Sequence, residues 1–188
     1  MIVSKLDSLL DLFRYVYALK KLERKGWRKK ARIKCPETVA AHSYGVALIT
    51  AILSDVLKCN SEKAVKMALL HDLAESVTGD LIPGELDERE KTRREVEAIR
   101  KIVLDLPPEI REEYLSLWEE YNEGISREAQ IVRDADKLDM ALQALNYSKE
   151  SKDKESFREF VESALKEAKN GEIRKIIDKV LTCLEMEE

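Results

Sequence analysis

The chain has 188 residues, of which 44% are hydrophobic and 37% are charged, and its formal net charge is −4 at pH 7. This length fits one domain with a real core, because a chain of this size buries about 70% of its unfolded surface. The six Gly and four Pro residues exclude collagen-like and low-complexity classes. The small negative charge provides no global attraction to nucleic acids or membranes, so neither is an expected partner.

The three cysteines, Cys35, Cys59 and Cys183, include no C-x-x-C pair. An odd number without such spacing argues against a disulfide framework. The N-terminus lacks a basic stretch followed by an apolar stretch, so no signal peptide is expected. The longest apolar-rich run, YGVALITAILSDVL, contains Asp55 and is too short for a membrane span. A cytoplasmic location is the simplest expectation.

Apolar residues recur with helical spacing along the chain, and no stretch longer than a few residues alternates as a half-buried strand would. The sequence therefore predicts an all-α fold. Thr38 and Ser61 are the expected N-caps of two helices, and Asn170-Gly171 is expected to end one. The predicted helices span residues 3–23, 38–58, 61–74, 87–104, 108–121, 125–148, 154–169 and 171–185.

The predicted helix at residues 125–148 has an apolar stripe with spacings of 4, 3, 4 and 3. Asp136 and Asp139 flank this stripe, each about 100° from a core position. Both carboxylates should therefore lie at the edge of the core rather than on the open face. The stripe consists of Ile131, Ala135, Leu138, Leu142 and Leu145.

The chain contains two histidines, His42 and His71, and both lie on apolar helical faces. Asp72 follows His71 directly, and Glu75 lies one turn beyond His71 on the same face. A single histidine in this setting is more often a hydrogen-bonded core residue, and a single Asp is usually a cap. Several such groups together would be costly to bury without a shared cation. Mixed imidazole and carboxylate donors suit a divalent transition metal.

These residues resemble the signature of the HD-domain metal-dependent phosphohydrolases, in which a His, a His-Asp pair and a later Asp follow in order. The resemblance is closest to the small 5′-deoxynucleotidase branch of that family. A His-Asp pair alone is weak evidence, but three similar segments in order are strong evidence. The segments are PETVAAHSYGVALIT, LLHDLAESVTGDLIP and IVRDADKLDMALQAL, with RKGW before the first.

The resemblance covers residues 10–148 and implies an HD-domain helical bundle. We expect one domain at residues 1–188, with a core at about 10–148 and additional C-terminal helices at about 154–185 packed on it. The amphipathic segment FREFVESALKEA either packs on this domain or joins a dimer. Members of the family form dimers, so the resemblance also implies a homodimer.

The resemblance implies that Glu75 is the catalytic carboxylate. Asp134 is an alternative to Asp136 as a ligand, and Asp136 is preferred because the D-x-x-[DE]-M pattern aligns there. Two histidines are too few for a binuclear phosphodiesterase site, which favours one metal ion: Mn, Co, Fe, Ni or Zn, with Mg less suited to imidazole ligands. The implied metal ligands are His42, His71, Asp72 and Asp136.

The resemblance also implies substrate contacts. Trp27 either stacks on a base or sugar or fills the core. The segment at residues 20–34 holds nine Lys or Arg and one Glu. This segment is a solvated loop, an RNA-binding strip or, as we favour, a patch of positive charge that attracts a phosphomonoester. The implied substrate-binding residues are Arg24, Trp27, Thr78, Asp80 and Asp139.

The sequence therefore predicts a metal-dependent phosphomonoester hydrolase whose partner is a small nucleotide monophosphate. The leading interpretation is a 5′-deoxynucleotidase that converts deoxynucleoside 5′-monophosphates to deoxynucleosides and phosphate. One alternative is another HD phosphohydrolase that acts on a different nucleotide or a small phosphodiester. The other is a non-catalytic, metal-stabilised helical module that binds a partner or RNA through residues 20–34.

Overall fold

A computed structural model describes residues 2–82, 84–151 and 153–186, with side chains from residue 10 onward. Over these residues the chain forms ten α-helices, and strand pairing is limited to one isolated bridge between Glu23 and Thr38. The predicted all-α fold is confirmed. The helices are α1 Ile2–Leu19, α2 Lys25–Ala31, α3 Val39–Leu57, α4 Ser61–Leu70, α5 Glu75–Thr78, α6 Glu88–Val103, α7 Pro108–Glu123, α8 Arg127–Ser148, α9 Lys154–Glu167 and α10 Gly171–Met186.

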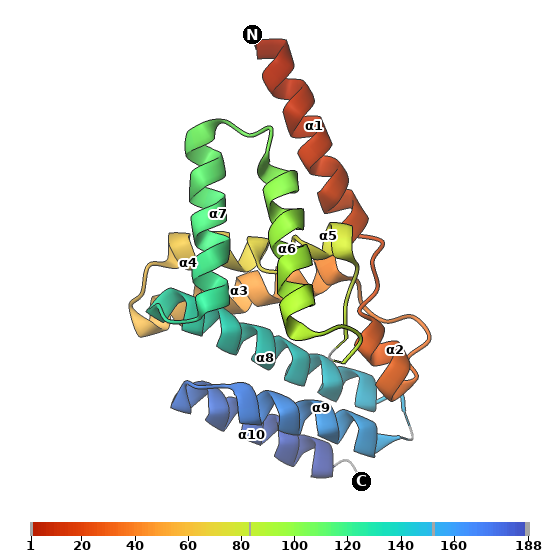
Figure 1. Cartoon of the computed structure of the whole chain (residues 1–188). Coiled ribbons are helices and arrows are strands. Elements are labelled where there is room, and N and C mark those ends of the chain that lie inside the picture. Colours follow the sequence, from red (N-terminus) through yellow and green to blue (C-terminus); the bar gives the residue numbers. More distant parts are fainter. Residues whose placement is uncertain (1, 83, 152, 187–188) are drawn as a thin grey trace.

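Helix α8 is the centre of the molecule. It packs against α3 and α4 on one side and against α9 and α10 on the other (Figure 1). Helix α7 also packs on α4 and α8, and α6 packs on α5 and α7. Helix α1 projects from the body with its N-terminal end (Figure 1). The bundle therefore has two layers that meet along one helix.

Each layer has its own apolar core. The first lies among α3, α4, α6, α7 and α8 and includes the fully buried Met67 and Ile99. The second lies among α2, α8, α9 and α10 and includes the fully buried Trp27 and Phe157. Each buried aromatic side chain removes about 150–250 Å² of its surface from water. The C-terminal helices are thus held on α8 by a core that they share with it.

Two helix ends differ from the prediction. The first predicted helix, at 3–23, ends at Leu19, and the separate helix α2 follows. The sequence predicts no helix between residues 23 and 38, whereas KGWRKKA forms α2 there. The third predicted helix, at 61–74, ends at Leu70. There the backbone tightens into i→i+3 hydrogen bonds, from Leu73 N to Leu70 O and from Glu75 N to Asp72 O. Such tight turns commonly end an α-helix.

Two capping predictions were wrong. The N-cap of α4 is Asn60 and not Ser61, because Asn60 Oδ1 accepts a hydrogen bond from Lys63 N at 3.1 Å. Asn170 does not end α9. Its side chain instead accepts hydrogen bonds from the backbone N–H groups of Glu172 and Ile173 at the start of α10. Asn serves both kinds of helix end. Thr38 caps α3 as predicted, accepting from Ala41 N.

Leu142 is 41% exposed, so the predicted stripe on α8 does not continue through it. Ala141 and Ala144 are fully buried instead. Because α9 and α10 cover a second face of α8, two faces of this helix are buried over its C-terminal half. A single-stripe pattern, which describes a helix packed on one side, therefore fails here.

By length and composition, helix α3 is long and apolar enough to cross a membrane, and about a third of its apolar stretch is buried inside the structure. It packs extensively on α4 and α8 and supplies His42 to the bundle interior. One face of α3 therefore lies in the core. The expectation that this apolar run is too short for a membrane span was wrong on length, because the helix begins at Val39, before the run YGVALITAILSDVL.

Candidate metal and active site

The two histidines are buried and held in defined orientations. His42 lies in α3 and is 1% exposed, and His71 is the C-cap of α4 and is 6% exposed. Nδ1 of His71 lies 2.6 Å from the carbonyl oxygen of Ala68, and Nδ1 of His42 lies 2.7 Å from Oδ2 of Asp139. A carbonyl only accepts, so Nδ1 of His71 donates. Each neutral ring then has its lone pair on Nε2.

The two Nε2 atoms share one carboxylate, that of Asp72. Nε2 of His71 lies 3.2 Å from Oδ2 of Asp72. Nε2 of His42 lies 3.7 Å from the same oxygen and 3.2 Å from Oδ1 of Asp136. Both nitrogen atoms are buried, and neither finds a hydrogen-bond partner among the described residues. His42, His71 and Asp72 each offer one ligand atom, and these three atoms lie within 4.8 Å of one another. This cluster could therefore hold a metal ion.

Asp134 and Asp136 have different surroundings. The two oxygens of Asp134 accept hydrogen bonds from Lys169 N at 2.7 Å and Asn170 N at 2.9 Å. Asp134 therefore ties α8 to the turn before α10. Residues two apart on a helix point about 200° apart, and Asp136 accordingly points the other way, toward His42. The geometry favours Asp136 as the ligand.

A close approach of α3 and α8 supports the position of His42. A Cβ atom at Gly45 would lie 2.1 Å from Oδ1 of Asp139, the residue that holds Nδ1 of His42. Gly in a helix interior costs about 1 kcal/mol relative to Ala, and such a position often marks close packing. The sequence analysis missed Gly45, although an isolated Gly inside the apolar helix was the available signal.

Glu37 was also missed. Its Oε1 accepts a hydrogen bond from Nε1 of Trp27 at 3.0 Å and lies 3.8 Å from Nε of Arg24. Glu37, His42 and Asp139 form a second cluster of potential ligands around the other face of the imidazole. Because Nδ1 of His42 is already engaged by Asp139, this cluster orients the ring rather than offering a free donor.

The carboxylates favour positive charge on the histidine. Burial, the largest influence, lowers the pKa of His42, and Arg24 lowers it too. Asp136 and Asp139 outweigh both and raise the pKa to about 9. Burial raises the pKa of Asp136, but the close contact with the His42 imidazole and the charge of Lys137 bring it well below its usual range. A divalent cation satisfies the same carboxylates without a proton on the ring, so the donor set fits a metal.

Glu75 lies at the start of α5, beside this cluster. Burial, followed by the charges of Asp72 and Asp80, raises the pKa of its carboxyl group well above the usual range, and Arg24 and Lys91 offset only part of this. A carboxyl group whose pKa lies nearer to neutral pH can both accept and donate a proton.

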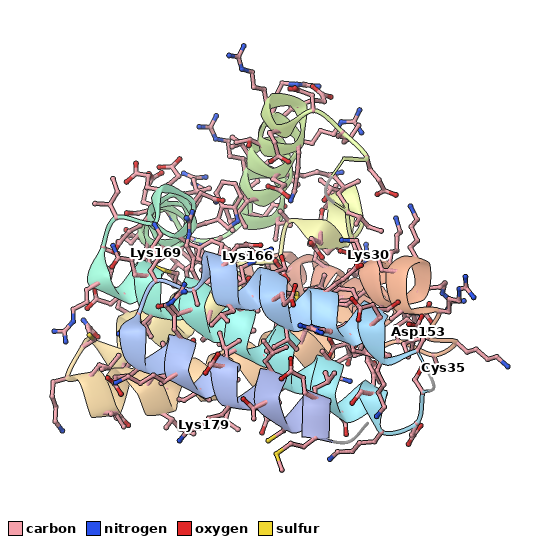
Figure 2. The ribbon with its side chains drawn as sticks, turned by 90° about the horizontal axis from the view of Figure 1, so that it is seen from below. Lys30, Cys35, Asp153, Lys166, Lys169 and Lys179 are labelled. Atoms are coloured by element: carbon pink, nitrogen blue, oxygen red, sulfur yellow. The ribbon has the colours of Figure 1, made fainter. Side chains whose placement is uncertain are left out.

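Two cavities meet at the cluster. The first, of about 280 Å³, has an apolar part that includes Ile82, Met140 and Phe160. The second, of about 340 Å³, is more polar and includes Gln130 and Arg133. Lys30 lines the first and Lys169 the second, and they lie toward opposite ends of α9 in Figure 2. The residues common to both are Asp72, Glu75, Lys91, Asp136, Lys137 and Glu167.

The predicted substrate-binding residues fall into two groups. Arg24, Trp27 and Asp80 line the first cavity, whereas Thr78 and Asp139 do not. The hydroxyl of Thr78 lies 3.4 Å from the carbonyl oxygen of Ala74, and Asp139 contacts His42.

Trp27 is 1% exposed and packs on Phe160 with ring centroids 4.2 Å apart. Its packing is that of a core residue whose edge reaches the cavity.

The basic segment at residues 20–34 is partly neutralised. Arg28 pairs with Glu23, and Lys29 pairs with Glu85 in the loop before α6. The backbone N–H of Lys25 donates to Asp80 in the same loop. These contacts fasten the loop over one side of the first cavity, and they leave Arg24 directed at Asp72 from 3.9 Å.

Comparison with known proteins decides the family. A family model described as HD domain matches residues 16–181. The chain belongs to the HD domain family. The predicted resemblance to this family is thereby confirmed.

Named relatives of this HD domain include enzymes. The human protein 5′-deoxynucleotidase HDDC2 is 39% identical over 141 residues, covering 74% of this chain and 68% of the relative. The protein of the same name from Xenopus laevis is 33% identical over 174 residues, covering 92% and 86%. Among solved structures, the PH0347 protein from Pyrococcus horikoshii OT3 is 37% identical with a TM-score of 0.75, covering 97% and 99%.

Proposed function

We propose that this chain is a metal-dependent 5′-deoxynucleotidase that converts deoxynucleoside 5′-monophosphates to deoxynucleosides and inorganic phosphate. The observation that carries this proposal is that two buried imidazole Nε2 atoms share the carboxylate of Asp72, and that one of them also lies beside Asp136, where both carboxylates line a cavity. The 5′-deoxynucleotidases of human and Xenopus laevis, which are similar over most of this chain, support the substrate class.

One divalent cation would be held by His42, His71, Asp72 and Asp136. Bound there, it would supply a water molecule with a pKa near about 7 and positive charge beside a phosphoryl oxygen. Imidazole ligands favour Mn, Co, Fe, Ni or Zn over Mg. The sequence contains no third histidine, which is consistent with a single ion.

Glu75 is the proposed base. It accepts a proton from the attacking water as the new bond from oxygen to phosphorus forms. It then returns that proton to the 5′-oxygen as the old bond from phosphorus to this oxygen breaks. The raised pKa of Glu75 suits both transfers. Arg24 would hold a phosphoryl oxygen through its guanidinium group.

The first cavity would receive the nucleoside. Asp80, fixed by the backbone N–H of Lys25, offers a carboxylate to a sugar hydroxyl. Ile82, Met140 and Phe160 offer apolar surface to the base. Thr78 borders the same loop, and Asp139 acts through His42.

Phosphate release from a panel of substrates tests the proposal. The panel contains deoxynucleoside and ribonucleoside 5′-monophosphates and a small phosphodiester, each with Mn, Co, Fe, Ni, Zn and Mg. Hydrolysis of the deoxynucleoside monophosphates with at least one metal is expected. Glu75→Gln should lose most activity while still binding metal by calorimetry. Hydrolysis of the diester alone would support the other HD phosphohydrolase, and metal binding without any hydrolysis would support the non-catalytic module.

We also propose a homodimer formed through α3. Tyr44, Leu48, Ile52 and Val56 are spaced four residues apart on α3, and each is more than half exposed. No charged residue is exposed on this helix before Asp55. An i±4 ridge packs into the same ridge of another helix, and a two-fold interface needs one self-complementary patch. A second copy of this chain is therefore the proposed partner.

A cytoplasmic location and a single domain complete the proposal. All three cysteines are free thiols, and Cys35 is exposed (Figure 2), which suits a reducing compartment. The match of the family model across residues 16–181 and the packing of α9 and α10 on α8 support one domain.

A further inference from the structure

Two lysines lie in the wall that the two cavities share, and they have different partners. Lys91 pairs with Glu95 of its own helix at 3.8 Å. Nζ of Lys137 lies 3.2 Å from Oδ2 of Asp136 and 3.0 Å from Oε2 of Glu167. Lys137 is therefore the lysine of this wall that contacts a proposed metal ligand.

The contact leaves the ligand atom of Asp136 free. Oδ1 is the oxygen that lies 3.2 Å from Nε2 of His42, whereas Lys137 lies at Oδ2. On the other side of the cluster, Nη1 of Arg24 lies 3.9 Å from Oδ2 of Asp72. Each proposed ligand carboxylate thus has one cationic side chain beside it, and Arg24 and Lys137 both line the first cavity.

The case for an anion here rests on position rather than on net charge. Six carboxylates and four basic side chains line the first cavity, so one divalent cation brings the lining close to neutral. Arg24 and Lys137 are the basic side chains beside the proposed ligand carboxylates Asp72 and Asp136, so they are the cations next to an anion bound at the metal centre. An ammonium group has three N–H donors, and the contacts with Asp136 and Glu167 leave one for a ligand in the cavity.

We propose that Lys137 binds the phosphoryl group of the substrate, opposite Arg24, and stabilises the negative charge on its oxygens during transfer. Glu167 of α9 is the positioning residue that holds the ammonium group in place. This inference rests on the proposed phosphomonoester hydrolysis and adds a phosphate contact supplied by α8. Donors placed where charge develops contribute strongly to catalysis in a partly buried site.

The test compares Lys137→Met, Lys137→Arg and Glu167→Gln with Lys169→Met. Lys169 is exposed and lines the second cavity but not the first, so its variant makes the same charge change away from the phosphate. Three quantities are measured: kcat and KM for a deoxynucleoside monophosphate, binding of inorganic phosphate to the metal-loaded protein by calorimetry, and affinity for the metal alone.

Lys137→Met should lower kcat/KM by about 100-fold or more and weaken phosphate binding by about 10-fold, with metal affinity changed by less than about threefold. Lys137→Arg should recover part of the phosphate binding. Glu167→Gln should show a smaller loss than Lys137→Met, and Lys169→Met should match the wild type.

Unchanged phosphate binding in Lys137→Met would overturn the proposal. So would a defect that saturating metal fully restores, because Lys137 would then only support Asp136. The calorimetric measurement needs no turnover. A different outcome separates the two proposals. If the wild type hydrolyses no monophosphate but binds phosphate, and Lys137→Met binds phosphate more weakly, the proposed function fails and the phosphate contact stands.

Discussion

Gly45 and Asp139 lie so close that a Cβ atom at position 45 would sit 2.1 Å from Oδ1 of Asp139. Asp139 in turn holds Nδ1 of His42 at 2.7 Å. The absence of one methyl group in α3 thereby sets the orientation of an imidazole that belongs to the proposed metal site.

Gly45→Ala should displace Asp139 from His42. Loss of a charge-assisted hydrogen bond costs about 1.5–3 kcal/mol, and the better helix propensity of Ala returns about 1 kcal/mol. A net loss of about 0.5–2 kcal/mol in the free energy of unfolding is expected, with metal affinity lowered about 10-fold or more. Urea unfolding and metal titration check these values.

Gly171→Ala is the matched control, because a Cβ atom there meets nothing within 4 Å. This control should be as stable as the wild type or slightly more stable. If Gly45→Ala keeps wild-type metal affinity, the coupling between Gly45, Asp139 and His42 does not exist.

Asp134→Asn and Asp136→Asn should separate stability from metal binding. Asp134 accepts two backbone hydrogen bonds at the turn before α10. Its amide variant would leave one donor without its acceptor, at a cost of about 1–3 kcal/mol, and should keep metal affinity. Asp136→Asn should instead lose most metal affinity at a smaller cost in stability. Chemical unfolding and metal calorimetry on the two variants decide between the residues, and the reverse pattern would make Asp134 the ligand.

The stability of the metal-free protein should fall as the pH rises. The folded-state pKa of His42 is raised to about 9, against about 6.5 for an ordinary histidine. A raised pKa contributes stability that is complete below about pH 6.5 and is lost as the pH passes through about 9. The free energy of unfolding should therefore decrease over this window, by up to about 3 kcal/mol.

Metal affinity should rise over the same window, because the ion competes with the proton for His42. Urea unfolding between pH 6 and 9, with a chelator and with saturating metal, measures both effects. A flat profile in the chelator series would show that Asp136 and Asp139 do not raise the pKa of His42 as described.

Leu48→Glu should convert the proposed dimer to a monomer. Leu48 is 51% exposed in the middle of the apolar ridge of α3, and a charge buried at the centre of a two-fold interface would face its own copy. Leu104→Glu, at a leucine that is 59% exposed at the end of α6, should leave the assembly unchanged. Light scattering coupled to gel filtration measures the mass of the assembly that each protein forms. A wild-type monomer, or a dimer that persists in Leu48→Glu, contradicts the α3 interface.

Much of the fold could be predicted because helical periodicity is a local property. The helix at 108–121 and the N-cap Thr38 depend on neighbouring residues alone. The exposure of Leu142 could not be predicted, because it depends on α9 and α10 covering another face of α8. The end of α4 at Leu70 was missed because His71 and Asp72 continue a helical pattern, while the backbone tightens to turn both side chains toward the cluster.

The candidate site divides in the same way. The order of His42, His71 with Asp72, and Asp136 can be read from the sequence, and the comparison bears out the family that this order resembles. Glu37 and Lys137 could not be identified, since each acquires its role from a residue on another helix or from the cavity that the packing creates, whereas Gly45 carried a signal but its partner Asp139 lies on another helix. Their chemistry is ordinary, and only tertiary contacts distinguish them from other glutamates, glycines and lysines.

Helices α2 and α9 form part of the wall of the first cavity, whereas the imidazoles and carboxylates of the proposed metal site come from α3, the α4–α5 turn and α8. Met140 adds to the wall from α8, the helix that also carries Asp136. Much of the wall and the reactive groups therefore come from different parts of the chain. Substitutions at Met140, Phe160 or Ser163 can reshape the space offered to a base without touching a proposed metal ligand. A bundle built in this way can change what it accepts while keeping one chemistry, and its C-terminal hairpin is the part to vary when a new substrate is sought.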